Sequence, residues 1–509
     1  MFENQPKALY ALALANTGER FGYYTMIAVF SLFLRANFGL SGDTAGLIYG
    51  VFLALVYFLP LVGGIMADKF GYGKMVTIGI IVMFAGYLFL SIPLGGGVMG
   101  YAAMFGALLL VSLGTGLFKG NLQVMVGNLY DAPELSAKRD SGFSIFYMAI
   151  NIGALFAPTA AVRIKEWAEH SLGYSGNDAY HFSFAVACVS LIVSMMIYYA
   201  FRSTFRHVEA GAGKSKKTDT AGTEEELTPQ QTKERIVALC LVFAVVIFFW
   251  MSFHQNGLTL TFFADEFVSP KSEGVQTMAF DVINLVMIIF MIYSLMSFFQ
   301  SKTSKAKLIS TVVFLAAVGV LVYKYHNIGG PVDVSAPIFQ QFNPFYVVAL
   351  TPVSMAIFGA LAAKGKEPTA PRKIAYGMII AGSAYLLMVL ASRGLLTPNA
   401  QAAAKAAGET VPFASGNWLI GTYLILTFGE LLLSPMGISF VSKVAPPKYK
   451  GTMMGGWFVA TAIGNLLVSV GGYLWNDIPL TIVWSVFIVL CLLSAGFMFL
   501  MMKRLEKVA

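Results

Sequence analysis

The sequence predicts an all-α integral membrane protein with two blocks of six helices and an accessory two-helix hairpin. Three observations predict this fold class: scarce charge, many apolar runs long enough to cross a bilayer, and basic residues gathered in alternate loops. Hydrophobic residues make up 57% of the 509 residues and charged residues only 12%, whereas soluble proteins carry roughly 25% charged residues. The mean hydropathy is +0.71. A chain with so little charge cannot keep its surface hydrated, so most of that surface must face lipid.

About 14 runs reach the roughly 20 apolar residues that a helix needs to span a membrane. One hydrophilic segment interrupts them after the sixth run, and it reads as a linker. The predicted spans lie at 8–36, 45–66, 75–93, 98–122, 142–163, 181–201, 236–264, 280–299, 308–326, 339–362, 374–396, 416–442, 450–474 and 480–502. The chain is therefore divided into an N-terminal six-helix lobe (1–201), a cytoplasmic linker (202–235), the first helix of a C-terminal lobe (236–264), an accessory transmembrane hairpin (265–338) and the remainder of that lobe (339–509).

The loops predict the orientation of the chain. Most of the 34 basic residues fall on one side when the spans are numbered in order, and Lys and Arg concentrate on the cytoplasmic side of membrane proteins. We therefore expect both termini in the cytoplasm, and the short outer loops suggest a bacterial inner (plasma) membrane. We also expect membrane lipid around the chain and a monomer.

Two six-helix blocks joined by a cytoplasmic linker are typical of a secondary transporter, whose substrate binds between the two lobes near mid-membrane. The hairpin at 280–326 carries no buried charge, so we expect it to have no part in transport. The three cysteines lie in apolar runs and form no CxxC pair, which argues against a disulfide or metal framework. Basic residues scattered over short loops argue against nucleic acid as a partner.

Other classes of protein fit less well. The five histidines are scattered and the chain contains no HExxH or GxSxG motif, so we do not expect an enzyme, a metal site or a cofactor. A receptor or scaffold fits the composition but leaves the charges inside the spans without a purpose. Binding without translocation would favour that class.

The first span carries a polar stripe. Asn16, Glu19, Arg20, Tyr23 and Tyr24 are spaced so that all five lie on one face of a helix. A charge at mid-membrane costs about 2.5–3.5 kcal/mol, so this face must line a cavity or contact another helix. The alternative interpretation is a structural Glu19–Arg20 pair that locks helices together.

Three further polar groups lie within spans. Lys119 follows glycines near the end of the fourth span, and Glu430 lies among leucines. A Glu430–Lys119 bridge without ligand is one interpretation of this pair. His254 is the only histidine deep within a span, and it is either a satisfied core residue or a proton carrier, since histidine titrates near neutral pH. Cations and carboxylates in both halves match a ligand that carries an ammonium at one end and a carboxylate at the other.

Four segments resemble one known family. The run from Glu19 to Tyr24 resembles the ExxERFxYY signature of the proton-coupled oligopeptide transporter family of the major facilitator superfamily. The runs at 146–153 (FYMAINIG) and 429–458 (GELLLSPMG to GGWF) resemble that family's fifth, tenth and eleventh helices, and the loop from 63 to 74 is similar to the superfamily's loop after the second helix. The resemblance implies the major facilitator fold.

By that resemblance, individual residues acquire roles. Arg20 and Lys119 would receive the carboxylate of a peptide, and Glu430 its amino terminus. Glu19 would be the leading proton-coupling residue, with Glu430 and His254 as further candidates. Substrate-binding residues that the resemblance adds are Asn151 and Asn343 for the peptide backbone, and Tyr23, Tyr24, Tyr57, Trp250 and Trp457 for its side chains.

The chain departs from the family pattern at three positions and in the place of its hairpin. Asn16 replaces the first signature glutamate, Ile27 replaces an arginine, and His254 replaces the acidic partner of that arginine. Because both the arginine and its acidic partner are replaced, neither is left as a buried charge without an opposite charge beside it. The extra hairpin follows the seventh span rather than the sixth. The leading hypothesis is proton-coupled symport of di- and tripeptides by alternating access, with the proton as coupling ion. The alternatives keep the fold and change the cargo to an atypical amine-bearing or anionic solute, or remove the coupling to protons and leave an uncoupled peptide facilitator or exchanger.

Overall fold

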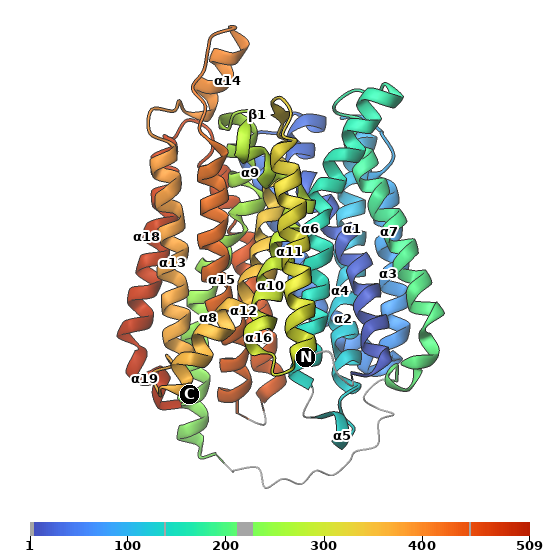
Figure 1. Cartoon of the computed structure of the whole chain (residues 1–509), viewed down its shortest axis with the longest axis vertical. Coiled ribbons are helices and arrows are strands. Elements are labelled where there is room, and N and C mark those ends of the chain that lie inside the picture. The colour runs from blue at the N-terminus through green and yellow to red at the C-terminus, as the bar shows by residue number, and fades with distance from the viewer. Residues whose placement is uncertain (1–4, 137–138, 211–226, 447–448, 509) are drawn as a thin grey trace.

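The computed structural model describes residues 5–136, 139–210, 227–446 and 449–508, and its long helices run side by side (Figure 1). Within these residues, thirteen helices are long and apolar enough to cross a membrane. The first helix, α1 (Lys7–Phe38), is not among them because of its polar stripe. Its 32 residues nevertheless extend about 48 Å at 1.5 Å per residue, more than the roughly 30 Å of a bilayer core. With α1 the total is fourteen, the number predicted.

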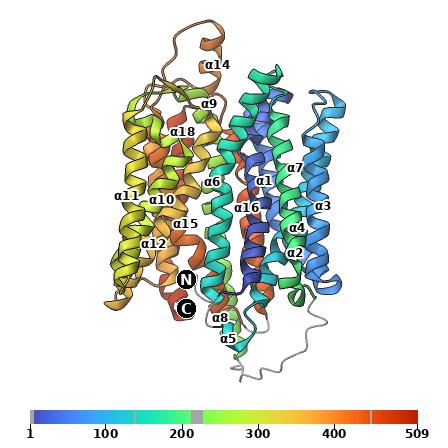
Figure 2. The ribbon, with the colours of Figure 1, turned by 45° about the vertical axis from the view of Figure 1, so that its right-hand side comes forward.

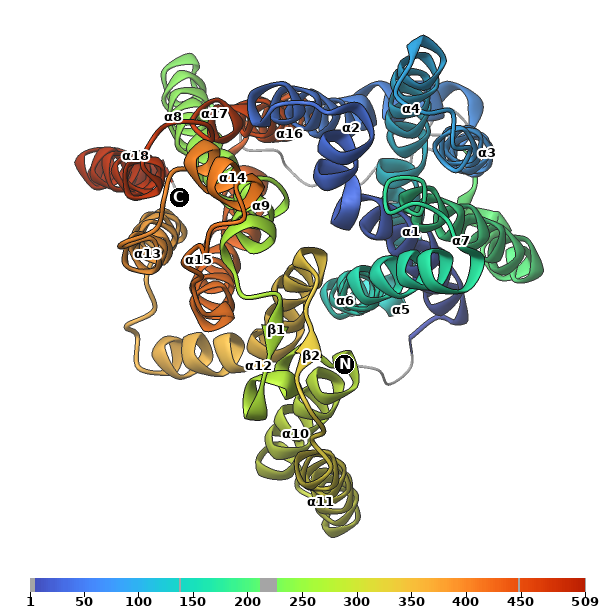
Figure 3. The ribbon, with the colours of Figure 1, turned by 90° about the horizontal axis from the view of Figure 1, so that it is seen from above.

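The long helices form two bundles when the molecule is seen along their axes (Figure 3). One, called the N-terminal lobe below, contains α1, α2 (Gly42–Phe70), α3 (Tyr72–Leu90), α4 (Val98–Asn128), α6 (Arg139–Leu172) and α7 (Tyr180–Ala200). The other, the C-terminal lobe, contains α8 (Pro229–Phe253), α9 (Thr259–Phe267), α12 (Phe342–Ala363), α13 (Ala370–Ala391), α15 (Gly416–Val444), α16 (Lys450–Leu466), α17 (Ser469–Tyr473) and α18 (Leu480–Leu500). The all-α membrane fold predicted from the sequence is confirmed.

The remaining elements lie at the ends and at one side. Helices α10 (Val282–Gln300) and α11 (Ser304–His326) form a hairpin that projects beside α12 (Figures 2 and 3). The upper end of Figure 1 carries the short α14 (Pro398–Ala406) and the strands β1 (Lys271–Ser272) and β2 (Val332–Asp333). The beginning of α1, α5 (Pro133–Ser136) and α19 (Met502–Val508) lie at the opposite, lower end. We use "upper end" and "lower end" in this sense.

The described part of the predicted linker begins with a fixed segment. Two short 3-10 turns, Arg202–Thr204 and Arg206–Val208, follow α7. Glu209 then accepts hydrogen bonds from Arg202 Nε at 2.9 Å and from the Tyr198 hydroxyl at 3.0 Å. Its carbonyl accepts from the Gly73 amide at 3.2 Å. Glu209 therefore fastens this segment to α3 and α7, whereas the central part of the linker, 211–226, lies outside the described residues.

The seventh predicted span is not one continuous helix. Between α8 and α9 the chain forms a 3-10 turn, η4 (His254–Gly257). A break in a membrane helix requires partners for the freed backbone groups. Gln255 supplies them by donating from Nε2 to the carbonyls of Met251 at 3.1 Å and Val468 at 3.0 Å, and the Tyr423 hydroxyl donates to the carbonyl of Asn256 at 3.0 Å. The sequence HQNG therefore produces a stable break that sets the position of His254.

Candidate functional site

The polar stripe of α1 is turned into the protein. Asn16, Glu19, Arg20 and Tyr23 are each less than 5% exposed. Arg20 donates from Nε and Nη2 to the two carboxylate oxygens of Glu19, both at 2.5 Å, and its guanidinium lies 4.6 Å from the centre of the Tyr23 ring. The expectation that this face avoids lipid agrees with the structure, and the Glu19–Arg20 pair is present.

Lys119 lies on α4 without an anionic partner. Within the described residues, no carboxylate lies within 4.0 Å of its ammonium group. The ammonium instead lies 4.1 Å from the centre of the Tyr57 ring of α2, and Glu19 and Arg20 are close enough to act on it electrostatically. Lys119 is therefore a partly buried cation held on an aromatic face by cation–π attraction.

His254 also lies close to Tyr57. The two ring centres are 6.1 Å apart, and the charge of Lys119 acts on His254. His254 Nδ1 hydrogen-bonds Asn465 Oδ1 at 2.6 Å, which requires the Nδ1–H form of the ring. Trp250 stacks on the imidazole at 5.1 Å. Tyr57 thus connects a cation of the N-terminal lobe with an imidazole of the C-terminal lobe.

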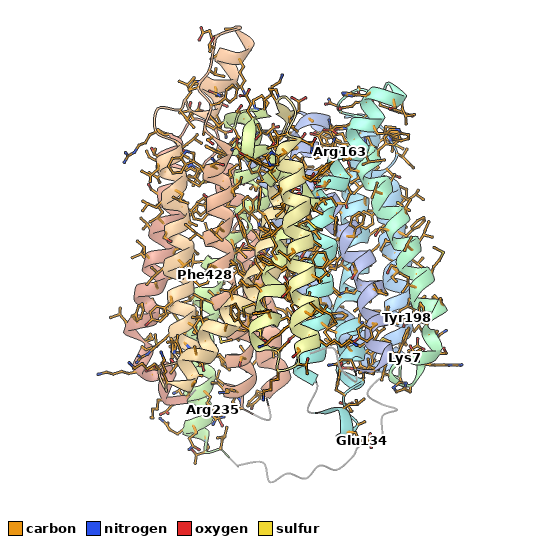
Figure 4. All side chains as sticks on the ribbon, viewed as in Figure 1. Lys7, Glu134, Arg163, Tyr198, Arg235 and Phe428 are labelled. Carbon is orange, nitrogen blue, oxygen red and sulfur yellow. The ribbon has the colours of Figure 1, made fainter. Side chains whose placement is uncertain are left out.

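Phe428 lies near half the height of the molecule (Figure 4), and Glu430 follows it two residues later in α15. It is 9% exposed. Asn343 of α12 donates from Nδ2 to Glu430 Oε2 at 2.9 Å and also contacts the hydroxyl of Thr427 at 3.1 Å. No cation lies within 4.0 Å of Glu430 among the residues that the structure describes. The interpretation of a direct Glu430–Lys119 bridge does not match this geometry.

The remaining predicted residues divide into two groups. Tyr24 and Tyr57 are half-buried. Asn151 is 7% exposed, and its amide donates to the Tyr147 carbonyl at 3.0 Å. The tryptophans are further inside: Trp457 is 3% exposed with its ring against Gly437, and Trp250 is 8% exposed. In this conformation both indoles pack within the C-terminal lobe rather than on an open wall.

Tyr147 marks a space between the lobes. It is 47% exposed, although its hydroxyl interacts electrostatically with Glu430 of the opposite lobe and with Tyr24 and Tyr57 of its own. Glu430 acts in the same way on Tyr24 and Tyr57. Lys119 lies on the Tyr57 ring, and Arg20 and Glu430 both act electrostatically on Tyr24 and Tyr57. Arg20, Lys119 and Glu430 therefore lie in one region between the two lobes, around these tyrosines.

The two lobes are joined by direct contacts at the upper end. Arg35 of α1 forms an ion pair with Glu266 of α9. Gln340 donates to the carbonyl of Ala28 at 3.1 Å, and Thr159 donates to Gln341 at 3.0 Å. Each of these contacts joins the two lobes.

Helix α2 also packs tightly on α16 and α17 at the upper end. A Cβ atom at Gly50 would lie 2.8 Å from the carbonyl of Leu466, and one at Gly46 would lie 3.0 Å from Cα of Gly472. Only glycine permits this approach. The lobes therefore meet at the upper end without room for a solute.

Sequence reasoning missed several of these residues. Asn465 and Thr427 are neutral and carry no distinctive signal in a single sequence. Tyr147 lies in the FYMAINIG run, but its role appears only when the opposite lobe is in place. Arg35 and Glu266 stand at the ends of their helices, where a charge is ordinary, and 231 positions separate them.

Comparison with known proteins agrees with the predicted fold. A family model described as the POT family matches residues 73–222 and 324–484. The chain is 27% identical over 481 residues to the dipeptide and tripeptide permease B of Xenorhabdus bovienii (strain SS-2004), covering 92% of this chain and 86% of the permease.

It is also 29% identical over 497 residues to the di-/tripeptide transporter of Lactococcus lactis subsp. cremoris, covering 92% and 89% of the two chains. The crystal structure of a peptide transporter POT in complex with sulfate superposes with a TM-score of 0.73 at 22% identity, covering 100% of this chain and 96% of that one. The superposition establishes a shared fold. The two segments that match the family model flank 223–323, which includes most of the α10–α11 hairpin.

Proposed function

Because this chain belongs to the POT family, we propose that it carries di- and tripeptides across a membrane in symport with protons. The printed functions of two relatives, a dipeptide and tripeptide permease and a di-/tripeptide transporter, support this cargo. The fold of two lobes around a central space supports alternating access, in which the lobes rock about a fixed site.

One observation carries the proposal. Lys119 of the N-terminal lobe and Glu430 of the C-terminal lobe are both close to Tyr57, and within the described residues neither is neutralised by an opposite charge within 4.0 Å. Two uncompensated charges at mid-membrane are costly. A zwitterionic peptide offsets both costs at once, because its carboxylate meets Lys119 and its ammonium meets Glu430. A simple anion would satisfy one group and be repelled by the other.

The other site residues complete this assignment. Asn343 orients the carboxylate of Glu430 by its hydrogen bond, and Asn151 is close enough to the space to bond the peptide backbone. Tyr24, Tyr57 and Tyr147 offer aromatic surface. Aromatic rings bury large areas without demanding one shape, so they suit a site that accepts many peptide side chains.

Three residues are the candidate proton carriers. Glu19 is held by Arg20 on both oxygens, so protonation of Glu19 would release Arg20 toward a peptide carboxylate. Glu430 and His254 are the further candidates, and His254 is linked to the N-terminal lobe through Tyr57. One proton that enters through 100 mV supplies about 2.3 kcal/mol, which corresponds to about fiftyfold accumulation of the peptide.

The direction of transport follows from the same proposal. We assign the lower end to the cytoplasm of a bacterial inner membrane, because the basic loops and both termini lie there and because cytoplasmic loops are rich in Lys and Arg. The closed upper end is then the outer side. We further propose that the monomer, surrounded by lipid, is the transporting unit.

Uptake of radiolabelled dialanine into liposomes that contain the purified chain tests the proposal. We expect uptake to rise when the medium is made more acidic than the lumen, and unlabelled dipeptides to compete better than free alanine or phosphate. Uptake that does not depend on the proton gradient would contradict the proposed coupling to protons. Competition by phosphate rather than by dipeptides would contradict the proposed peptide substrate.

A further inference from the structure

A second polar cavity lies at the upper end, away from the central space. Its volume is about 420 Å³, within the range of roughly 300–1,000 Å³ that small-molecule sites occupy. Segments from three places in the chain enclose it: residues 268–280 after α9, residues 334–339 before α12, and residues 413–416 before α15. Two of these segments are the roots of the α10–α11 hairpin.

The walls of the cavity are fixed by hydrogen bonds. Strand β1 pairs with β2 (Figure 3) in antiparallel fashion, and the amide of Ala414 donates to the carbonyl of Phe267 at 2.7 Å. Gln276 Nε2 donates to Asn417 Oδ1 at 3.0 Å, and the hydroxyl of Ser272 donates to Gln276 Oε1 at 3.2 Å. The cavity therefore exists before any ligand arrives.

The lining combines an aromatic floor with two separate charges. Phe280 and Phe339 are buried and pack edge to face at 5.2 Å, while Phe413 is 46% exposed on the wall. Lys271 and Glu273 are both exposed and both line the cavity. Within the part of the chain that the structure describes, neither forms an ion pair. Asp333 lies opposite Lys271 in the strand register but does not come within 4.0 Å of its ammonium group.

The two charged side chains lie on the same face of one strand. Residues 271 to 273 are extended, since β1 ends at Ser272 and Glu273 has φ −129° and ψ 156°. Side chains two positions apart on an extended chain point to the same face, with their Cα atoms about 7 Å apart. An extended dipeptide separates its carboxylate and its ammonium by a similar length, at roughly 3.3–3.6 Å per residue. A ligand with one positive and one negative end can therefore contact both side chains.

We propose that this cavity is a capture site that holds a zwitterionic dipeptide with its carboxylate on Lys271 and its ammonium on Glu273. Apolar side chains of the dipeptide would rest on Phe280, Phe339 and Phe413. The proposal rests on the proposed function, since it adds a first binding step on the outer face before the central site. It also gives the hairpin a purpose, because the roots of the hairpin build two walls of the cavity.

Uptake kinetics test this capture site. In liposomes, Lys271→Ala/Glu273→Ala should raise the KM for alanyl-phenylalanine about fivefold, because two exposed charge contacts with the dipeptide are lost. The maximal rate should stay unchanged. The rise should be smaller for trialanine. The matched control is Arg393→Ala/Glu409→Ala, which removes one cation and one anion that are exposed at the upper end outside the cavity, and its KM should equal that of the wild type. An unchanged KM in the cavity variant, or the same change in the control, overturns the proposal.

A binding measurement separates this inference from the proposed function. In detergent, the variant Lys119→Ala/Glu430→Gln lacks the central charges, and calorimetry with alanyl-phenylalanine should still detect one site per chain. Adding Lys271→Ala/Glu273→Ala should weaken binding at that site about fivefold. Failure of the wild type to transport any peptide rejects the proposed function. If the wild type transports dipeptides but the variant Lys119→Ala/Glu430→Gln binds none in calorimetry, the capture site alone is rejected.

Discussion

Replacement of Glu430 by glutamine removes a charge from the site and almost nothing else. The amide has the size of the carboxylate, and its oxygen still accepts the hydrogen bond that Asn343 donates at 2.9 Å. Within the described residues no cation lies within 4.0 Å of Glu430, so no buried partner is left unpaired. The folded protein should persist, and the loss should fall on the ligand.

The size of the loss follows from the bond between Glu430 and the peptide ammonium. A hydrogen bond to a charged group contributes about 1.5–3 kcal/mol, so Glu430→Gln should lower uptake of dialanine at low concentration by about 10- to 150-fold. The sharper readout is selectivity. The wild type should prefer dialanine over N-acetyl-dialanine, which lacks the ammonium, and the variant should lose that preference.

Competition between dialanine and N-acetyl-dialanine in liposomes measures this preference directly. The matched control is Glu234→Gln, which removes a half-buried carboxylate of α8 that is paired with Lys507 of α19 and should leave the preference intact. If Glu430→Gln keeps the wild-type preference for the free amino terminus, Glu430 does not bind it and the assignment of the two lobes to the two ends of the peptide is wrong.

The other predictions concern the cation of the site, the closed upper end and the lower end. Lys119→Ala should reduce dipeptide uptake at least tenfold, because the peptide carboxylate loses a charge-assisted bond; wild-type uptake by well-folded protein would refute the role. Arg35→Ala should destabilise the state that is closed at the upper end by about 1 kcal/mol, because it removes one partly exposed ion pair with Glu266. Spin-label distances across the upper end should then show about fivefold more of the open state. An unchanged distance distribution would contradict this. The hydrogen bond from Arg372 lowers the pKa of Glu506 below its ordinary value of about 4.5. This stabilisation is present above that ordinary value and is lost as the pH falls through the lower folded value. Glu506→Gln should therefore lower the thermal unfolding midpoint slightly at pH 7 and by progressively less as the pH falls below about 4.5; an effect that does not change with pH would exclude the linkage.

The sequence was informative wherever a residue had to escape lipid. The spacing of Asn16, Glu19, Arg20 and Tyr23 predicted a single protected face, and all four are buried. Lys119 and Glu430 were predicted to lie within spans, and they lie in the long helices α4 and α15. The physical reason is that an isolated charge in hydrocarbon is costly enough to restrict where it can lie. The roles assigned to these residues, and the division of the chain into lobes, linker and hairpin, stay predictions.

The sequence was silent where the signal depends on a partner far along the chain. Nothing near Arg35 indicates that Glu266 is its partner, and nothing near His254 indicates Asn465. The break in the seventh span was also missed, because a helix and a helix with a 3-10 turn have the same apolar content. The upper cavity arises from three loop segments, and only their folding back together creates it.

The most direct test of the central claim is the proton that accompanies the peptide. Liposomes that contain the chain and a pH-sensitive dye in the lumen should acidify when dialanine is added outside, in proportion to the radiolabelled dipeptide that enters, and Lys119→Ala should remove both signals. Entry of the labelled dipeptide at the same rate with no change in lumenal pH would contradict the account.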